Sequence, residues 1–360
     1  MMRVVVWRRS KLKDCLVKLL KLMGLLLVLM VLVLPIRNTI LQFVLPGMWL
    51  EHSSLFLFKV MLDSQSFPVA DIPIGKNPIK LVPNFDDIKV KFTNRGKTYP
   101  AYYEQMGLLQ RSTPSDLRAH DRLNELLKFK PMMSEYERAV AMFTVDVFIR
   151  ACETANLTYF LISGSLLGSR RHHGMIPWDD DIDIIVNGSE WRKVRDVLAN
   201  IQGFELFSPG KVQWKFFMSA LPQGNRPFKW PNIDLFFFNE DETHIWALTW
   251  GAKSSLCSKK SDVFPLKRRK FELWNMPVPR ASRSLVAAEF GDYRSNCVTA
   301  SYVHKTNVAY SSSSLVEVSC RNLHEVFPFV FQETGDQGIV IEVLRLAGKP
   351  LDNISLSEDF

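Results

Sequence analysis

Apolar residues take up a regular spacing from Ser134 onward. Ser134 and Glu137 form a capping box, and apolar side chains then recur at roughly helical intervals, which predicts a helix that ends near Asn156. The apolar run at residues 159–163 predicts a buried strand, and the Gly-Ser pair that follows it predicts a turn. Residues 166–172 are expected to form a short helix or a loop.

Further helices and strands are predicted downstream. Ser189 caps a helix whose apolar residues, between 191 and 201, share one face. The other predicted elements are an extended segment within 175–186, strands at 215–218 and 233–238, a strand-and-turn region at 262–279, and a helix from Ser282 that stops at Gly291. Helices and strands interleaved in this way indicate an α/β or α+β fold.

The pattern before Ser134 is different. Residues 16–36 are mostly apolar, and Lys18 and Lys21 are the charged residues among them. The long side chains of these lysines can reach the membrane–water interface, so we expect one transmembrane helix there. A cleaved signal peptide is the rival interpretation, but no small-x-small site follows the run. Positive charge on the N-terminal side places the tail in the cytosol and the rest across the membrane, a type II topology.

The charge of the chain is concentrated at its N-terminus. Of a formal net charge of +8, seven Lys and Arg residues against Asp14 leave about +6 in residues 1–21, so the remainder carries about +2. That remainder is too nearly neutral for a surface that follows nucleic-acid phosphates, so we expect no nucleic-acid partner. Apolar residues make up 47% of the chain, which argues against global disorder.

Two weaker signals agree with a lumenal location. Triplets that begin at Asn156, Asn187 and Asn353 are glycosylation acceptors if that part of the chain is lumenal. Outside the tail, an even number of cysteines remains, which suits an oxidising compartment: Cys152, Cys257, Cys297 and Cys320. Four cysteines allow three pairings, and buried free thiols are the alternative interpretation.

The most informative chemistry lies in three alternating aspartates. Asp179, Asp181 and Asp183 lead directly into an apolar run. In an extended strand alternate side chains share one face, so these carboxylates are expected to lie together. Three like charges held that close repel one another, and a hard divalent cation would neutralise them.

Two further features belong with these aspartates. Gly164 and Ser165 follow a predicted buried strand, where glycine permits close backbone approach and the hydroxyl and N–H groups can hold a phosphate. Asp234 lies within an apolar strand, so its carboxylate needs a cation or a donor nearby.

A Gly-Ser turn, an Asp-x-Asp strand and a later lone aspartate together resemble the nucleotidyltransferase superfamily. The wider context is similar to the LicD family, which includes fukutin and fukutin-related protein. The segments that carry this resemblance are residues 163–168, 170–174, 176–183, 262–266 and 289–292. The resemblance covers about residues 134–292 and implies a nucleotidyltransferase-like mixed sheet flanked by helices, behind an N-terminal transmembrane helix and stem.

The resemblance also implies a reaction and a cofactor. The family transfers a phospho-alcohol group, such as ribitol phosphate or phosphocholine, from a cytidine diphosphate (CDP) donor to a sugar hydroxyl. Carried onto this chain, Asp181 and Asp183 would be the main ligands of Mg²⁺ (or Mn²⁺), with Asp179 as a third. Asp234 would complete the site and orient or deprotonate the acceptor hydroxyl.

The donor phosphates would be held by backbone and basic groups. Gly164 and Ser165 would contact them, and Arg170 and Arg171 would clamp them through bidentate hydrogen bonds. Lys267 begins a basic run, residues 267–270, for which a phosphate-binding rim and a solvated turn are the two interpretations.

Neighbouring polar and aromatic residues have structural interpretations as well. Asp180 is expected to face away from the metal and to accept a solvent or backbone hydrogen bond. His172 and His173 are expected in an exposed loop rather than on the substrate. For Trp178, packing beside the strand and stacking on a base are equally favoured.

The sequence thus predicts a Golgi or ER membrane protein that modifies a glycan or glycoprotein acceptor, with glycosyltransferases as partner candidates. A noncatalytic lumenal partner of glycosyltransferases that retains the fold is the alternative, and a nucleotidyltransferase acting on nucleic acid is disfavoured. The expected segments are a cytosolic tail (1–15), a signal anchor (16–36), a stem or small N-terminal region (37–130), a LicD-like catalytic domain (131–320) and a C-terminal extension (321–360).

Overall fold

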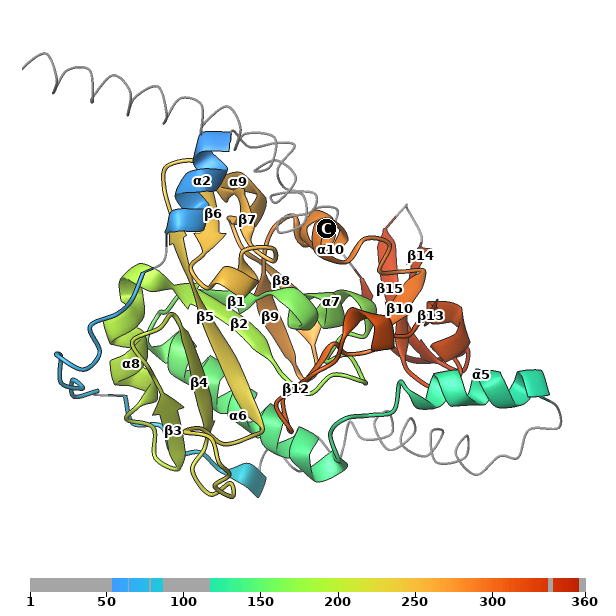
Figure 1. Ribbon diagram of the computed structural model, residues 1–360, viewed down its shortest axis with the longest axis horizontal. Helices are drawn as coiled ribbons and strands as arrows, with labels where there is room; N and C mark the ends of the chain where they lie inside the picture. Colours follow the sequence, from blue (N-terminus) through green and yellow to red (C-terminus); the bar gives the residue numbers. More distant parts are fainter. Residues whose placement is uncertain (1–53, 64, 78, 87–116, 336–338, 356–360) are drawn as a thin grey trace, which may run out of the picture. The chain divides into compact units, whose positions relative to one another are not determined.

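The computed structural model describes residues 54–63, 65–77, 79–86, 117–335 and 339–355 (Figure 1). The chain divides into a unit of residues 1–57 and a unit of residues 58–360, and the described strands belong to the second. The predicted tail and transmembrane helix lie outside the described residues. Among the helices that are described, none combines the length and apolar character needed to cross a membrane.

A mixed sheet forms the centre of the second unit (Figure 1). Its described strands follow the order β1-β2-β5-β4-β3, with β6 paired to β5 and β7 paired to β6. Their bounds are β1 (Tyr159–Leu161), β2 (Asp183–Asn187), β3 (Phe204–Phe207), β4 (Gln213–Met218), β5 (Asn232–Glu240), β6 (His244–Ala247) and β7 (Cys257–Lys259). The β2–β5 pair is parallel, and the other pairs are antiparallel.

Alternate residues of the strands supply two hydrophobic cores. The larger core includes Leu161, Ile184 and Leu235 together with residues of α6 (Glu135–Thr154) and α8 (Trp191–Leu198). The smaller core includes Phe160 and Ile185, which point to the opposite face of the same strands. The other α-helices in the described residues are α2 (Ser54–Leu62), α5 (Leu117–Leu127), α7 (Ser163–Arg171), α9 (Lys260–Val263) and α10 (Ser282–Phe290). The α/β class predicted from the alternation of elements is confirmed.

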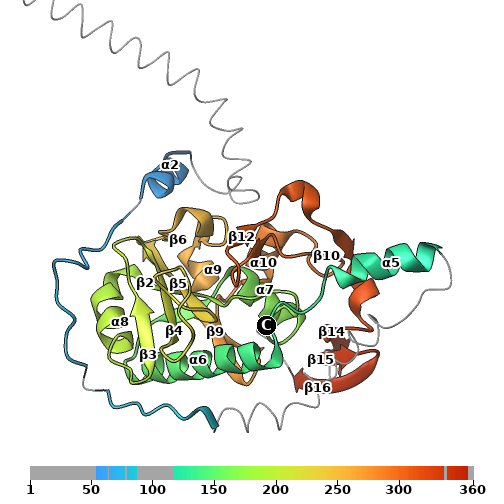
Figure 2. The ribbon, with the colours of Figure 1, turned by 60° about the horizontal axis from the view of Figure 1, so that its bottom comes forward.

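The first predicted helix begins at its predicted cap. The Ser134 side chain accepts a hydrogen bond from Glu137 N, and Glu137 Oε2 accepts one from Ser134 N at 2.8 Å, so the capping box is confirmed. The helix, α6, ends at Thr154, and Asn156 has a left-handed backbone with φ of 49°. It contacts β4 and β5, so it covers one face of the sheet (Figures 1 and 2).

The turn predicted at the Gly-Ser pair is wrong. Residues 163–171 form one helix, α7, which starts directly after β1. Tertiary contacts stabilise this helix despite its glycines: α7 contacts β2, β8 and α10, and the Ser165 hydroxyl accepts a hydrogen bond from Asp183 N at 2.9 Å.

Several small antiparallel sheets follow the central one (Figure 2). They are β8 (Lys267–Phe271) with β9 (Trp274–Val278), β10 (Asn296–Val298) with β13 (Glu317–Ser319), β11 (Tyr302–Val303) with β12 (Val308–Ala309), and β14 (Phe329–Thr334) with β15 (Val340–Leu346) and β16 (Lys349–Ser355). The predicted strand-and-turn region at 262–279 therefore contains α9 and the β8–β9 hairpin.

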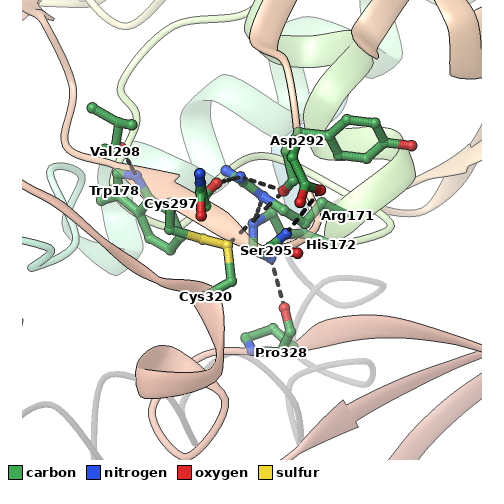
Figure 3. The surroundings of a disulfide bond; sticks show 11 residues. Arg171, His172, Trp178, Asp292, Ser295, Cys297, Val298, Cys320 and Pro328 are labelled. Carbon is green, nitrogen blue, oxygen red and sulfur yellow. Dashed lines mark hydrogen bonds between the residues drawn. A yellow bond between two sulfur atoms is a disulfide. The ribbon is translucent and has the colours of Figure 1, made fainter.

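The four cysteines outside the tail divide into a disulfide and two thiols. Cys297 of β10 is bonded to Cys320, which directly follows the paired strand β13 (Figure 3). Cys152 and Cys257 are buried free thiols. The disulfide therefore fastens β10 to the end of its partner strand.

Buried ion pairs connect the β8–β9 hairpin to other elements. Glu272, in the hairpin turn, pairs with Arg138 of α6, and their side chains are 0% and 4% exposed. Glu342 of β15 pairs with Arg269 of β8 at 2.6 Å and with His173 Nε2 at 3.0 Å. We call these five residues the ion-pair network. The basic run at 267–270 is thus a strand rather than a turn, because Arg269 points inward to a buried carboxylate.

Candidate active site

Two adjacent strands bring the central carboxylates together. Asp183 is the first residue of β2, and Asp234 lies opposite it in register on the parallel neighbour β5. Residues in register on neighbouring strands point to the same face, so the two side chains lie side by side. They are 8% and 2% exposed, which leaves little water to solvate either charge.

Asp179 and Asp181 join this cluster from the loop before β2. The single strand predicted over all three aspartates is wrong, because β2 begins only at Asp183. The loop is instead hydrogen-bonded to a segment much later in the chain. The buried Asp180 carboxylate accepts hydrogen bonds from the backbone N–H groups of His304 at 3.0 Å and Lys305 at 2.8 Å. The expected backbone hydrogen bond of Asp180 is therefore confirmed.

The three alternating aspartates nevertheless share one cavity. We call it the carboxylate cavity; it has a volume of about 460 Å³ and is lined by Asp179, Asp181 and Asp183 together with Ser163, Gly164 and Glu289. A Cβ atom at Gly164 would lie 3.0 Å from Asp179 Oδ2 and 3.9 Å from Asp183 Oδ2. The absence of a side chain at Gly164 therefore leaves the space beside these two carboxylates open.

Burial and mutual repulsion act on each of these acids. Burial raises the pKa of Asp183 well above its ordinary value, and the charges of Asp234 and Asp179 raise it further. The pKa values of Asp179 and Asp181 are raised for the same reasons. A cation bound among these oxygens would oppose both effects and favour the ionised carboxylates.

Asp234 already has a cationic neighbour. Lys215 lies opposite it on β4, and the two side chains form an ion pair, while Gln213 Nε2 donates to Asp234 Oδ2 at 3.4 Å. The predicted need of Asp234 for a cation or donor is met in this way. Lys215 is not among the predicted site residues; the usable signal is the alternation of Gln213 and Lys215 with apolar residues, which places both polar side chains on one face of a strand.

His304 adds a nitrogen atom to the cluster. Its Nε2 lies 3.1 Å from Asp181 Oδ2, and ligand atoms of Asp181, Asp234 and His304 all lie within 4.8 Å of one another. His304 and Tyr302 also line a second cavity, of about 950 Å³, together with Asp234 and Lys215. The carboxylate cluster therefore lies where two cavities meet. No sequence signal linked His304 to the aspartates, because 121 residues separate it from Asp183.

Comparison with known proteins fits this arrangement. Residues 156–281 match the family model described as LicD/FKTN/FKRP, nucleotidyltransferase domain. This stretch of the chain, about a third of its length, is thus similar to the LicD family. Its LicD-family segment contains α7, which supplies Gly164, and β2, the loop before it and β5, which supply the clustered aspartates.

Two relatives give the extent of the similarity. The chain is 37% identical over 68 residues to the lipopolysaccharide cholinephosphotransferase LicD of Haemophilus influenzae, which is 19% of this chain and 26% of that protein. It is 25% identical over 118 residues to the uncharacterised protein RT0683 of Rickettsia typhi, which is 32% of this chain and 34% of that protein. The chain thus spans about a quarter to a third of the length of these relatives.

The LicD-family arginines have other partners in this structure. Arg171 lines the carboxylate cavity, but its guanidinium donates to Tyr293 O at 3.1 Å and lies 5.4 Å from the Trp178 ring centroid. Arg170 donates to Ser282 Oγ at 2.8 Å and does not line this cavity. Lys267 lines neither of the two cavities. Of the predicted basic phosphate ligands, the structure brings only Arg171 to the carboxylates.

Ser165 does not line the carboxylate cavity. Its hydroxyl meets the first backbone N–H of β2 and the residue is 5% exposed. In this position Ser165 fixes the start of the strand that carries Asp183, while its neighbour Gly164 lines the cavity itself.

The exposed loop predicted for His172 and His173 is wrong. Both are buried: His172 Nδ1 lies 2.7 Å from Pro328 O (Figure 3), and His173 Nε2 pairs with Glu342. Trp178 is 3% exposed and donates from its indole to Val298 O at 2.9 Å. The residues that cover 172–178 come from the part of the chain after residue 281, where the LicD-family match ends. The local sequence therefore gave no indication that this segment is buried.

Proposed function

We propose that this protein transfers a phospho-alcohol group, of the ribitol-phosphate or phosphocholine kind, from a CDP-linked donor to a hydroxyl of a lumenal glycan. The family match and the name of the Haemophilus influenzae relative support a transferase of this class. The observation that carries the proposal is the cluster of Asp179, Asp181, Asp183 and Asp234 beside the bare backbone of Gly164.

The donor atoms fit a divalent metal ion. Carboxylate oxygens are the ligands that Mg²⁺ and Mn²⁺ prefer, and here they are buried close together with too few cationic partners. Asp181 and Asp183 would hold the ion, with Asp179 and Asp234 beside them. When bound, the ion would supply positive charge to the donor diphosphate and to the departing cytidine monophosphate (CMP).

The chain's own groups account for the rest of the reaction. Gly164 lets a phosphate approach the carboxylates without steric contact from a side chain. The acceptor oxygen forms a bond to the phosphorus of the phospho-alcohol group as the bond from that phosphorus to the CMP oxygen breaks. Asp234, which faces the larger cavity beside Lys215, takes the proton of the acceptor hydroxyl.

A lumenal location is part of the proposal. The predicted anchor at 16–36 would hold the protein in the Golgi or ER membrane with a type II topology. The Cys297–Cys320 disulfide supports an oxidising compartment on the side of the folded unit. Glycosyltransferases that build the acceptor glycan are the partners we expect there.

The test is a donor screen with the purified full-length chain. We expect CMP release from CDP-ribitol or CDP-choline with Mg²⁺ and a glycan acceptor, and loss of release in Asp181→Asn and Asp183→Asn. Asp121→Asn, on the exposed side of α5, is the matched control and should retain activity. Donor binding without CMP release in any combination would support the noncatalytic partner instead.

A further inference from the structure

His304 has the surroundings of a metal ligand rather than of a solvent-exposed histidine. Its Nδ1 lies 3.1 Å from the Asp180 carboxylate, and its Nε2 lies 3.1 Å from Asp181 Oδ2. Asp180 is fully buried, with both its oxygens engaged by the backbone of His304 and Lys305, so it holds the ring from a fixed position.

This arrangement specifies what each ring nitrogen does. An ionised carboxylate only accepts hydrogen bonds, so Nδ1 donates to Asp180, and Nε2 is the ring atom directed at Asp181. Nε2 and Asp181 Oδ2 lie 3.1 Å apart, a separation that suits two ligand atoms of one bound metal ion. A histidine that donates its outer N–H to a carboxylate is the usual support of a metal-ligating imidazole.

A second observation points to a cation. The Asp183 side chain lines the same cavity and is 8% exposed, yet within the described part of the chain no hydrogen-bond donor or ion-pair partner meets its carboxylate. Its neighbour Asp234 does have such a partner in Lys215. An acid buried to this degree without a partner is costly, and a bound cation would remove that cost.

We propose that His304 is a nitrogen ligand of the metal centre, held by Asp180, and that this centre prefers a first-row transition ion to Mg²⁺. The inference rests on the proposed function for its metal site but names a residue and an ion class beyond it. Imidazole favours transition ions, whereas an all-carboxylate site favours Mg²⁺. Asp180 acts as a positioning residue, which explains why an aspartate that turns away from the cavity stands inside the acidic run.

Mn²⁺ alone is the probe, with the full-length chain and pulsed electron paramagnetic resonance as the readout. We expect bound Mn²⁺ to show coupling to a directly bound imidazole ¹⁴N nucleus in the wild type. His304→Gln should lose this coupling and bind Mn²⁺ about 10- to 100-fold more weakly. His244→Gln, whose ring contacts the Thr243 hydroxyl, is the matched control and should keep both.

Asp180→Asn keeps the proposal testable if His304→Gln fails to fold. This variant should retain the ¹⁴N coupling while its Mn²⁺ affinity falls about tenfold, because an amide orients the ring less firmly. Bound Mn²⁺ without ¹⁴N coupling in the wild type, coupling that persists in a folded His304→Gln protein, or no Mn²⁺ binding would each overturn the proposal.

CMP release in the same samples separates this proposal from the proposed function. Wild-type protein that releases CMP but shows no ¹⁴N coupling would contradict the role of His304 and leave the transferase. Wild-type protein with ¹⁴N coupling and no CMP release from any donor would contradict the transferase and leave the metal ligand.

Discussion

The carboxylate cavity and the ion-pair network both contain buried acidic side chains, but only in the network are those acids paired mainly with basic residues. In the network, Glu272 and Glu342 meet Arg138, Arg269 and His173. In the cavity, aspartates face mainly other aspartates, and their pKa values are raised. Paired charges indicate a structural role, whereas like charges held together indicate a place for a ligand.

The largest effect on stability is expected at the Arg138–Glu272 pair. Glu272→Ala leaves a buried guanidinium without this partner, so we expect the free energy of unfolding to fall by about 3–5 kcal/mol. Denaturant titration measures this change. Glu153→Ala, which removes an exposed partner of Arg268, is the control and should cost less than about 1 kcal/mol. An equal loss of unfolding free energy in the two variants would contradict a structural role for the network.

The second prediction concerns pH and Glu342. Burial would raise the pKa of Glu342, but the hydrogen bond from His173 and the charge of Arg269 outweigh it and lower the pKa to about 2. A folded-state pKa below the unfolded value contributes stability at neutral pH, here about 2–3 kcal/mol, which is lost as pH falls from about 5 toward 2. Glu342→Gln should lose this contribution, and unfolding measured across that pH range should show a flatter curve than the wild type.

Much of the scaffold was predictable because its signals are local. The capping box at Ser134 marks the start of α6, and the apolar run with Asp234 inside it lies in β5. The motif around Gly164 led to the family that the comparison confirms.

The incorrect predictions share a physical cause, which is contact between segments distant in sequence. His172 and His173 are buried by residues near Pro328 and by Glu342, more than 150 positions later. Asp180 bonds to the backbone at His304, which pulls the aspartate loop away from a regular strand. The pairing of Lys215 with Asp234 depends on the register of β4 and β5, which the alternation of polar residues in one strand does not give. His304 reaches the aspartates from a later loop, so no spacing in the sequence reveals it.

A third prediction tests the open space in the cavity. Gly164→Ala puts a methyl group 3.0 Å from Asp179 Oδ2, so we expect CMP release to slow about ten- to hundredfold with little change in stability. Gly251→Ala is the control, because a Cβ atom there meets nothing within 4 Å. A fully active Gly164→Ala protein would show that phosphate does not approach along this backbone.

The smallest expected effect is the change in stability when Asp183 is replaced by a neutral residue, and its sign is the informative part. With a chelator present, Asp183→Asn should stabilise the protein by about 1 kcal/mol, because it removes one of the charges that repel each other. Glu342→Gln, the equivalent change in the network, should destabilise it. Thermal unfolding of both variants measures the contrast, and a loss of stability in both would mean that the two regions do not differ.

The most direct measurement of the central claim is CMP release from a CDP-alcohol by the full-length chain, with and without Mg²⁺, in the wild type and in Asp183→Asn. We predict release that needs both the metal ion and the Asp183 carboxylate. Release that continues undiminished in Asp183→Asn, or in excess chelator, would contradict a metal-dependent centre in the carboxylate cavity.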